Sequence, residues 1–305
     1  MAFRLIKTPH FETYDRISPA KLREELKGKS VLITGSGYGI GAAIARSFAE
    51  AGVDNIHISG RTEKPLKDTA EELGKAFPNT HVGYHIVDIV STDDVNRLFE
   101  EIKEPVDILV NNAGMMNSAM NFIDMNIKAW WRTLEVNVFG TAQVIHTYLR
   151  QRRDAAAKAS NPLPQAVVIT VNSGSALYWP IPNQTGYGPS KAALARLTEL
   201  LPLEFPASDV RFVSLHPGSI ATGMIEKQDP VAIGPLSDIK LPADFAVWLT
   251  SREADFLAGR FAWANWDVDE LVGKKQEIAE KDLLKTDLRE ERLERGFVPG
   301  ESQFK

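Results

Sequence analysis

The sequence predicts an α/β protein built on one doubly wound parallel sheet, a Rossmann-like arrangement. Short apolar, β-branched segments alternate along the chain with longer amphipathic ones, as in repeated strand–helix–strand units. The strand segments are continuous apolar runs, which is typical of strands buried on both faces of a parallel sheet. The first strand also runs into a glycine-rich turn and then a helix. Ligands of such sheets bind beyond the carboxyl ends of the strands.

The expected elements follow one another in a regular order. The apolar runs that we predict as strands cover Val31–Thr34, Asn55–Ser59, His81–Val87, Val106–Val110, Ala166–Val171, Val210–Leu215 and Phe261–Ala264. The segments with helical spacing of apolar residues cover Gly39–Ala51, Glu63–Ala76, Thr92–Ile102, Met125–Arg153 and Tyr187–Leu203. There is no internal repeat and no domain linker, so a single α/β domain is expected.

The chain divides into this domain and two flanking segments. We assign the domain to residues 28–270, an N-terminal extension to residues 1–27 and a charged tail to residues 271–305. In the tail, Lys274–Arg295 carries its charges at helical spacing, which predicts a solvated helix. Prolines gather in and around residues 222–242, and this long stretch is expected to be a substrate loop or lid.

Composition excludes several classes of function. The 305 residues include 35 Lys and Arg against 40 Asp and Glu, a net charge of −5, so a basic nucleic-acid footprint is absent. The chain has no cysteine, which excludes disulfides and thiolate sites, and its six histidines show no ligand spacing, so no metal is expected. No apolar run approaches the ~20 residues that cross a bilayer, and the first residues lack a secretory signal. We expect a cytoplasmic protein.

The turn after the first strand predicts a dinucleotide site. From Thr34 to Gly41 the sequence reads TGSGYGIG, and a helix follows at once. Glycines bring backbone N–H groups close to an anion, and the helix N-terminus adds the positive end of its dipole. An ordinary tight turn can have the same composition, but its place after the first strand favours a cofactor. The residues expected to bind it are Gly35, Ser36, Tyr38, Gly39, Ile40 and Gly41.

The end of the second strand indicates which dinucleotide binds. A carboxylate at this point would bind the ribose 2′-hydroxyl of NAD, but Gly60 stands where it is expected. Arg61 comes next, and an arginine here accommodates a 2′-phosphate through charge-assisted hydrogen bonds. We therefore expect NADP(H) to be preferred, with NAD(H) as the second cofactor. The alternative is that Arg61 is a solvated loop residue or stacks on the adenine.

Two later segments carry chemistry. Asn111–Gly114 reads NNAG and directly follows a predicted strand. Tyr187 and Lys191 lie four residues apart and so share one face of a helix. An ammonium group beside a phenol lowers the phenol pKa from its ordinary value near ~10, which would make Tyr187 a usable acid and base. The segment Asn172–Ser175 ends another strand, so a hydroxyl can point at the same site.

Together these segments resemble the short-chain dehydrogenase/reductase family, in particular a group common among its fungal members. Thr34–Gly41 resembles the family's T-G-x-x-x-G-x-G turn, and Asn111–Gly114 its N-N-A-G segment. Tyr187–Lys191 resembles the Y-x-x-x-K motif, and Pro217–Thr222 the P-G-x-x-x-T motif. The match covers about residues 28 to 270, with the motifs in the family's order.

The resemblance implies hydride transfer between a nicotinamide and a carbonyl or alcohol carbon. Tyr187 would give or take the alcohol proton, and Lys191 would lower its pKa and bind the nicotinamide ribose. Asn137 would anchor a water relay to the lysine; otherwise it pins a neighbouring strand. Further cofactor contacts are implied for Asp88, at the adenine amine, and for Ile89, Asn112, Ala113, Gly114, Pro217, Gly218, Ile220 and Thr222. The resemblance also implies a homodimer or homotetramer built on Met125–Arg153 and Tyr187–Leu203.

The catalytic serine has two candidates. The family's serine lies thirteen residues before the tyrosine, where this chain has Gly174, flanked by Ser173 and Ser175. We prefer Ser173, because it lines up with the end of the strand. Ser175 is assigned to the substrate side.

The substrate pocket is expected to be roomy and apolar. Methionines follow the NNAG segment at Met115, Met116, Met120 and Met125. Methionine adapts to bulky apolar ligands, although these residues could equally fill the core. The residues expected to contact a bulky ketone are Met115, Ser175, Tyr178, Trp179 and Met224.

Two other functions share these residues. One is a redox-neutral isomerase, dehydratase or cyclase that uses the tyrosine with a bound cofactor. The other is a non-catalytic protein that only binds the cofactor. Intact Tyr187, Lys191 and Asn137 favour the ketoreductase or alcohol dehydrogenase.

Overall fold

A computed structural model describes residues 5–117, 119–177, 182–223 and 235–287 of the 305-residue chain. In this part of the chain, seven strands form one parallel sheet with the order β3-β2-β1-β4-β5-β6-β9. The strands are β1 (Ser30–Thr34), β2 (Asn55–Gly60), β3 (His81–Ile86), β4 (Ile108–Asn111), β5 (Ala166–Val171), β6 (Val210–His216) and β9 (Arg260–Trp263). The order reverses between β1 and β4, so the predicted doubly wound sheet is confirmed.

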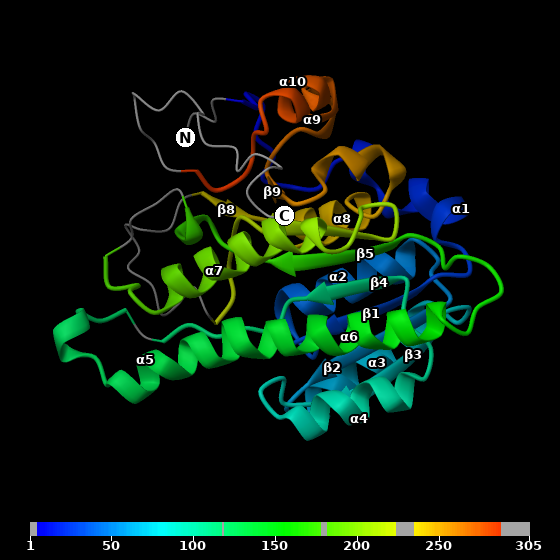
Figure 1. Cartoon of the computed structure of the whole chain (residues 1–305), viewed down its shortest axis with the longest axis horizontal. Coiled ribbons are helices and arrows are strands. Elements are labelled where there is room, and N and C mark those ends of the chain that lie inside the picture. Colours follow the sequence, from blue (N-terminus) through cyan, green and yellow to red (C-terminus); the bar gives the residue numbers. More distant parts are fainter. Residues whose placement is uncertain (1–4, 118, 178–181, 224–234, 288–305) are drawn as a thin grey trace, which may run out of the picture.

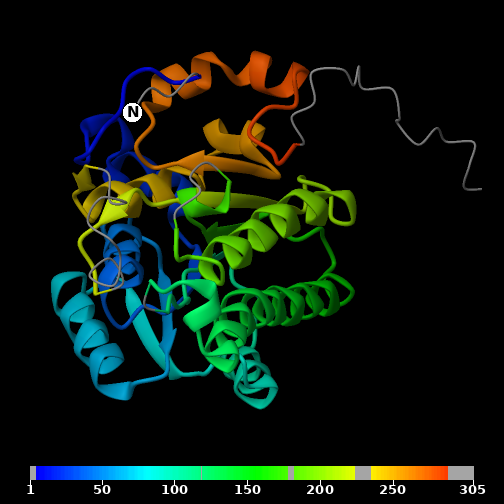
Figure 2. The ribbon, with the colours of Figure 1, turned by 90° about the vertical axis from the view of Figure 1, so that its left-hand side faces the viewer.

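Helices cover both faces of the sheet. One layer holds α2 (Gly39–Glu50), α3 (Glu63–Ala76) and α8 (Lys240–Trp248), and the other holds α4 (Thr92–Ile102), α6 (Thr141–Ala156) and α7 (Tyr187–Leu200). Each layer closes its own hydrophobic core against the sheet. The arrows of β4 and β5 in Figure 1 point to the left-hand side, which Figure 2 turns toward the viewer. The site residues described below gather at this edge, where the strands end.

The long helix predicted at Met125–Arg153 is interrupted in the structure. It consists of α5 (Ile127–Leu134), a π-helical segment at Glu135–Gly140 and α6. Single π-helical turns are rare and frequently lie at functional sites. This one contains Asn137, whose buried side chain bonds to backbone beyond β4. The turn therefore serves to position a predicted catalytic residue.

The stretch between β6 and β9 differs most from the prediction. Helix α8 begins at Lys240, inside the predicted loop, and has no counterpart among the predicted helices. Its residues from Leu241 to Trp248 are all buried, so no polar face marks it as a helix. Two short strands, β7 (Ser219–Ile220) and β8 (Leu236–Ser237), pair in parallel before it. Residues 224–234 of the predicted loop lie outside the described residues.

The tail is also less helical than expected in the part that the structure describes. Helix α9 (Val268–Gly273) precedes α10 (Lys275–Glu280), and residues 281–287 are not helical. The rest of the predicted tail helix lies outside the described residues. Shorter elements are α1 (Arg23–Leu26) and 3-10 turns at Asp15–Ile17, Pro19–Leu22, Phe122–Asp124, Gly174–Ala176, Leu201–Leu203 and Arg252–Leu257.

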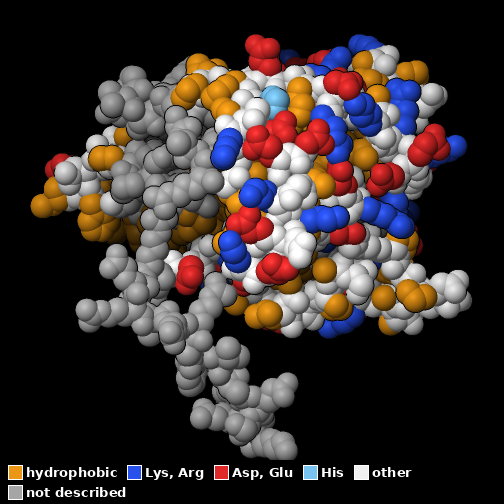
Figure 3. Space-filling model, turned by 90° about the horizontal axis from the view of Figure 1, so that it is seen from above, with side chains coloured by type: hydrophobic (Ala, Val, Ile, Leu, Met, Phe, Trp, Pro, Cys, Tyr) orange, Lys and Arg blue, Asp and Glu red, His pale blue; other side chains and the backbone are white. Residues whose placement is uncertain are grey.

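The N-terminal extension packs into the main core from residue 5 onward. Ile6, Ile17 and Leu26 are buried in the same hydrophobic cluster as α8 and β9. Figure 3 views the molecule from above Figure 1, and on this face acidic and basic side chains are interspersed rather than segregated by sign. No helix of the described residues has the length and apolar character that a membrane span requires.

Candidate functional site

In the turn after β1, the positions of Gly35 and Gly41 have no room for a side chain. Gly35 and Gly39 have φ angles of +65° and +62°, a region that glycine adopts at little cost. A Cβ on Gly35 would lie 2.7 Å from the Cα of Ala113, and one on Gly41 would collide with the Gly35 carbonyl oxygen and the Asn112 side chain. Bare backbone therefore lines the turn and leads directly into α2, an arrangement that fits a pyrophosphate.

Asn112 holds this turn in place. Its Nδ2 donates to the carbonyl oxygens of Thr34 at 3.0 Å and Gly35 at 2.8 Å. The Thr34 hydroxyl in return accepts the N–H groups of Asn112 and Ala113, both at 3.1 Å. These bonds join the carboxyl ends of β1 and β4. Asn112 thus acts on the cofactor turn through the backbone.

Ser36 has a similar role within the protein. Its hydroxyl donates to the Ile33 carbonyl at 2.7 Å and accepts the Ser59 N–H at 3.0 Å, while its own N–H donates to the Ser59 carbonyl. The hydroxyl and the N–H of Ser36 are thus both used inside the fold. Its predicted contact with a cofactor receives no support from these groups.

The other predicted cofactor residues lie within this turn or in the segments that follow the strands. Arg61 is exposed just after β2 and forms no ion pair with any residue that the structure describes. The Asp88 carboxylate lies 3.4 Å from the Arg132 guanidinium of α5. On the opposite side, the Thr222 methyl group lies 3.9 Å from where a Gly39 Cβ would stand. Tyr38 is largely exposed, Gly114, Gly218 and Ile40 are partly buried, and Ile89, Pro217 and Ile220 are buried.

Tyr187, Ser173 and Lys191 come together beside this turn. Tyr187 opens α7, and Ser173 follows β5 at the start of a turn that packs against this helix, with the Ser175 carbonyl oxygen 3.2 Å from where a Gly188 Cβ would stand. The Lys191 Nζ lies 5.8 Å from the centre of the Tyr187 ring and donates to the Val171 carbonyl at 2.8 Å. One helix and one strand end thus bring a phenol, a hydroxyl and an ammonium group to the same place.

Asn137 completes the group from the π-helical segment. Its Oδ1 accepts the Met115 N–H at 2.8 Å, and its Nδ2 donates to the Met115 carbonyl and the Ser190 hydroxyl, both at 2.9 Å. A Cβ on Gly114 would lie 3.2 Å from Asn137 Oδ1 and 3.6 Å from Lys191 Nζ. Asn137 therefore pins the segment after β4, as the alternative interpretation had it, and it does so within reach of the lysine.

Burial dominates the electrostatics of this group. Burial lowers the pKa of Lys191 to about 8. It also raises the pKa of Tyr187, and the hydrogen bond from Ser173 only partly opposes this shift. The expectation that the pKa of the Tyr187 phenol is lowered is thus wrong for the protein without a bound cofactor. The reason is that the phenol is desolvated and the Lys191 ammonium is bonded to Val171 rather than to the phenol.

The contacts of the two serines differ. Ser173 partly offsets the upward shift in the Tyr187 pKa, and its Oγ accepts the Ser175 N–H at 3.2 Å, which caps the short 3-10 turn Gly174–Ala176. The Ser175 hydroxyl lies 3.2 Å from the Ser173 hydroxyl. This geometry favours Ser173 as the serine that acts with Tyr187.

His216 is a site residue that the sequence analysis missed. It ends β6, and its Nδ1 accepts the Gly174 N–H at 3.0 Å, next to Ser173. Burial lowers the pKa of His216 to about 3, so the ring is neutral and can accept this bond at ordinary pH. Its position directly before Pro217, the first residue of the P-G-x-x-x-T motif, could have pointed to His216.

A small cavity lies beside Tyr187. Met116, Met125, Thr133 and Gln184 are among its lining residues. Met115 packs against one hydrophobic core, and Met120 is exposed. Two of the four methionines after the NNAG segment thus line space next to Tyr187.

Tyr178, Trp179 and Met224 lie outside the described residues. Among the described residues, no group of three or more His, Asp or Glu side chains is arranged to hold a metal.

A family model described as short chain dehydrogenase matches residues 29–231. The chain belongs to the short chain dehydrogenase family. It is similar to short chain dehydrogenase mpl6 of Monascus purpureus, with 33% identity over 297 residues that cover 94% of this chain and 97% of the relative. Short chain dehydrogenase/reductase nsrO of Aspergillus novofumigatus is 33% identical over 284 residues, covering 90% and 93%. The predicted resemblance to the family and to fungal members is confirmed.

Solved structures agree. A short-chain type dehydrogenase/reductase from Mycobacterium marinum superposes with a TM-score of 0.69 at 26% identity, covering 81% of this chain and 97% of that one. A short chain dehydrogenase from Mycobacterium smegmatis gives a TM-score of 0.66 at 26% identity, covering 78% and 92%. The short chain dehydrogenase described here is therefore an oxidoreductase of a family that binds NAD(P)(H).

The glycine turn leads to a first prediction. Gly41→Ala places a Cβ against Gly35 and Asn112, so we expect a loss of dinucleotide affinity of more than about tenfold, together with lower stability. Gly74→Ala is the matched control, because a Cβ there meets no atom within 4 Å and alanine favours helix α3. Calorimetric titration with NADPH and thermal unfolding of both variants measure this. Equal affinities in the two variants would contradict the assignment of the turn.

Proposed function

We propose that this short chain dehydrogenase is an NADP(H)-dependent ketoreductase or alcohol dehydrogenase, with Tyr187 as the general acid and base. The observation that carries the proposal is the placement of Tyr187 and Lys191 on α7, with Lys191 Nζ 5.8 Å from the centre of the Tyr187 ring and the turn that begins after Ser173 packed against the same helix. Nothing but a proton donor and a polarising hydroxyl is needed at the carbonyl oxygen once a hydride donor is bound. When bound, NADPH supplies that hydride.

The chain's own residues divide the work at the carbonyl. Ser173 donates a hydrogen bond to the carbonyl oxygen and orients it. Tyr187 transfers its phenolic proton to this oxygen as the carbon receives hydride, so that a ketone becomes a secondary alcohol. The buried Lys191 ammonium and the Asn137 amide hold the part of the site around Tyr187 where the cofactor would bind. The turn at Gly35–Gly41 fits the pyrophosphate, because it runs directly into the N-terminus of α2, and Gly35 and Gly41 let it pack closely on Ala113 and Asn112.

The electrostatics favour the reductive direction. Because burial raises the pKa of Tyr187, the phenol is protonated throughout the neutral range and is ready to act as an acid. Oxidation of an alcohol would need the phenolate, which this environment disfavours. We therefore propose reduction of a carbonyl as the direction that the protein supports.

For the cofactor we propose NADP(H) over NAD(H). Arg61 is exposed directly after β2, and no described residue neutralises it with an ion pair. An uncompensated guanidinium at this position suits a phosphate monoester better than a ribose hydroxyl.

For the substrate we propose a bulky, apolar ketone. Support comes from Met116 and Met125, flexible side chains that line the cavity beside Tyr187; its volume of about 10 Å³ means that they must move to admit such a ketone. Activity toward multi-ring ketones that exceeds activity toward acetone-sized ones tests this proposal. A redox-neutral reaction would instead turn over substrate without a stoichiometric change in NADPH absorbance.

We also propose a homodimer or homotetramer in the cytoplasm. The helical stretch from α5 to α6 exposes Ile127, Trp131 and Phe139, and the end of α7 exposes Leu200 and Leu203. Large apolar side chains gathered on two neighbouring elements are typical of a surface that a second copy covers. Size-exclusion chromatography with light scattering measures the oligomeric state.

The first test of this function removes the proton donor. Tyr187→Phe is expected to lower kcat for ketone reduction by about 10²- to 10⁴-fold, because only the phenolic hydroxyl is lost. Ser173→Ala should approach the same loss, whereas Ser175→Ala should retain most of the activity. Steady-state kinetics with NADPH measure all three. A fully active Tyr187→Phe variant would sink the proposal, and an inactive Ser175→Ala beside an active Ser173→Ala would exchange the two serines.

A second test uses pH. Because the pKa of Lys191 is about 8, its cationic form is present below this pH and is lost as pH rises through it. We expect kcat/KM for NADPH, which reports the free enzyme, to fall with an inflection near pH 8. Tyr187 adds no inflection below its ordinary pKa, because burial shifts its pKa upward. Lys191→Arg stays charged and should lose the inflection. A flat wild-type profile up to pH 9.5 would argue against a role for this ammonium.

A third test concerns Arg61. Arg61→Asp removes the cation and offers a carboxylate to a ribose hydroxyl, so the ratio of kcat/KM for NADPH over NADH should fall by about 10- to 100-fold. Lys67→Gln is the control, since it removes an exposed cation from the neighbouring helix α3. If Arg61→Asp keeps the wild-type ratio, Arg61 does not select the cofactor.

A further inference from the structure

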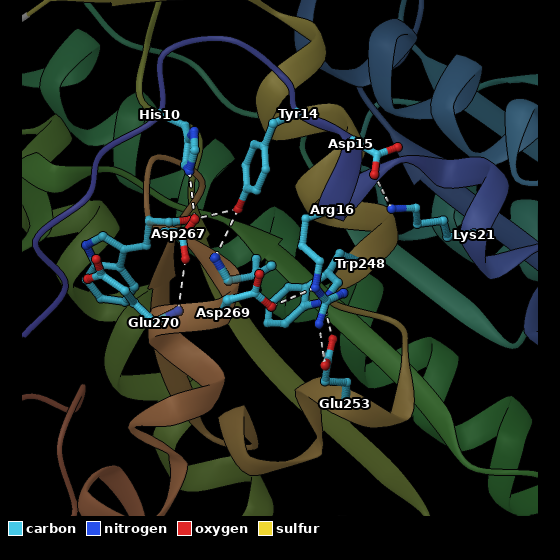
Figure 4. A network of polar contacts seen from close by, with 12 residues as sticks. His10, Tyr14, Asp15, Arg16, Lys21, Trp248, Glu253, Asp267, Asp269 and Glu270 are labelled. Carbon is cyan, nitrogen blue, oxygen red and sulfur yellow. Dashed lines mark hydrogen bonds and ion pairs between the residues drawn. The ribbon is translucent and has the colours of Figure 1, made fainter.

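The N-terminal segment, residues 5–17, is fastened to the end of the domain by polar contacts (Figure 4). The Asp267 carboxylate caps α9 at the Glu270 N–H and bonds to the His10 ring at 2.9 Å. His10 stacks on Tyr14, with ring centroids 3.7 Å apart, and the Tyr14 hydroxyl accepts the Val268 N–H at 3.0 Å. These contacts lie far from Tyr187 in sequence, and nothing in the proposed function uses them.

Further bonds fix both ends of this segment. Arg16 forms ion pairs with Glu253 at 2.5 Å and with Asp269 at 2.7 Å (Figure 4). The Lys7 N–H donates to the Glu270 carboxylate at 2.7 Å. His10 lies between these ends and is held by its own contacts with Asp267 and Tyr14 rather than by Arg16.

Asn265 joins this segment to the cofactor side. It is buried, and its Nδ2 donates to the His10 carbonyl at 2.7 Å and to the Ser237 hydroxyl of β8 at 2.9 Å. The His10 N–H donates back to the Asn265 carbonyl at 2.8 Å. One amide group thus ties together the N-terminal segment, β8 and the residues after β9.

The same amide forms the wall behind Gly218. Gly218 has a φ angle of +84°, and a Cβ there would lie 2.8 Å from Asn265 Oδ1 and 3.0 Å from Ser237 Oγ. Gly218 belongs to the Pro217–Thr222 motif, and its neighbour β7 pairs with β8. The Asn265 side chain therefore packs directly against this turn, and its orientation is tied to His10 by the hydrogen bond at 2.7 Å.

We propose that Asn265 is a positioning residue for cofactor binding, oriented by the N-terminal segment through the His10 carbonyl. The inference rests on the proposed function, because it assumes that the Gly218 turn faces the dinucleotide. It gives the extension a role: through Asn265, residues outside the family-matched region determine the affinity for the cofactor.

The test compares NADPH affinity across full-length variants. Asn265→Leu is similar in size but forms neither hydrogen bond, and we expect the Kd for NADPH, followed by its fluorescence, to rise about tenfold. Arg16→Leu is the matched control, since it breaks two ion pairs of the same segment without touching Asn265. It should lower the unfolding temperature and leave the Kd within about twofold of wild type.

Asn265→Asp separates positioning from simple packing. Its carboxylate can still accept from Ser237 but faces the His10 carbonyl, so affinity should be low at pH 8. Burial beside that carbonyl raises the pKa of the introduced carboxyl above its ordinary value near ~4, so protonation at lower pH restores a donor toward the carbonyl. We therefore expect the ratio of variant to wild-type Kd to fall toward one as pH decreases to 5.5, while the ratio for Asn265→Leu stays constant.

Each outcome bears on the proposal. A folded Asn265→Leu variant with wild-type affinity overturns it, as does an Arg16→Leu variant that loses affinity equally, since general destabilisation would then explain both. A pH-independent ratio for Asn265→Asp also counts against it. If the wild-type protein binds neither NADPH nor NADH, the proposed function fails instead.

Discussion

The site depends on the junction between the ends of β1 and β4. Asn112 donates two hydrogen bonds to Thr34 there, from its backbone N–H and from its side chain, and the side chain also donates to the Gly35 carbonyl. A parallel sheet leaves the last carbonyls and N–H groups of its strands without partners at the edge, and buried backbone groups need them. One side-chain amide meets that need and at the same time fixes the glycine turn. The glycines then supply a surface that no other residue could, because a Cβ at Gly35 or Gly41 would overlap neighbouring backbone.

On the catalytic side, too, buried polar side chains provide hydrogen-bond partners for backbone groups. Asn137 satisfies both backbone groups of Met115 and also bonds to Ser190, and the π-helical segment brings its side chain to this depth. Lys191 is buried beside it with the Val171 carbonyl as acceptor. Holding an ammonium group in such a place costs free energy, and its lowered pKa is the measure of that cost. Perturbed pKa values of this kind are typical of groups at functional sites.

The strands of the sheet and the motif residues could be predicted from the sequence. Features that depend on burial or on packing between distant segments could not. The central strands could be predicted because each is a short apolar run, whereas β3, an edge strand of exposed and half-buried residues, could be predicted only from its place between two helical segments. Helix α8 could not, since its residues from Leu241 to Trp248 are buried on every side and lack periodicity. The upward shift in the Tyr187 pKa follows from burial in the folded protein, which spacing along a helix does not reveal. The roles of His216 and Asn265 arise from contacts between distant segments, and no local pattern announces such contacts.

The attachment of the N-terminal segment has a consequence for folding. His10 and Asp267 are separated by 257 positions, so their contact joins two segments that have the whole sheet between them along the chain. Contacts of such separation form late and slow the final step of folding. Ile6 and Ile17, which flank His10 and are buried, are expected to reach their native packing in the same late step.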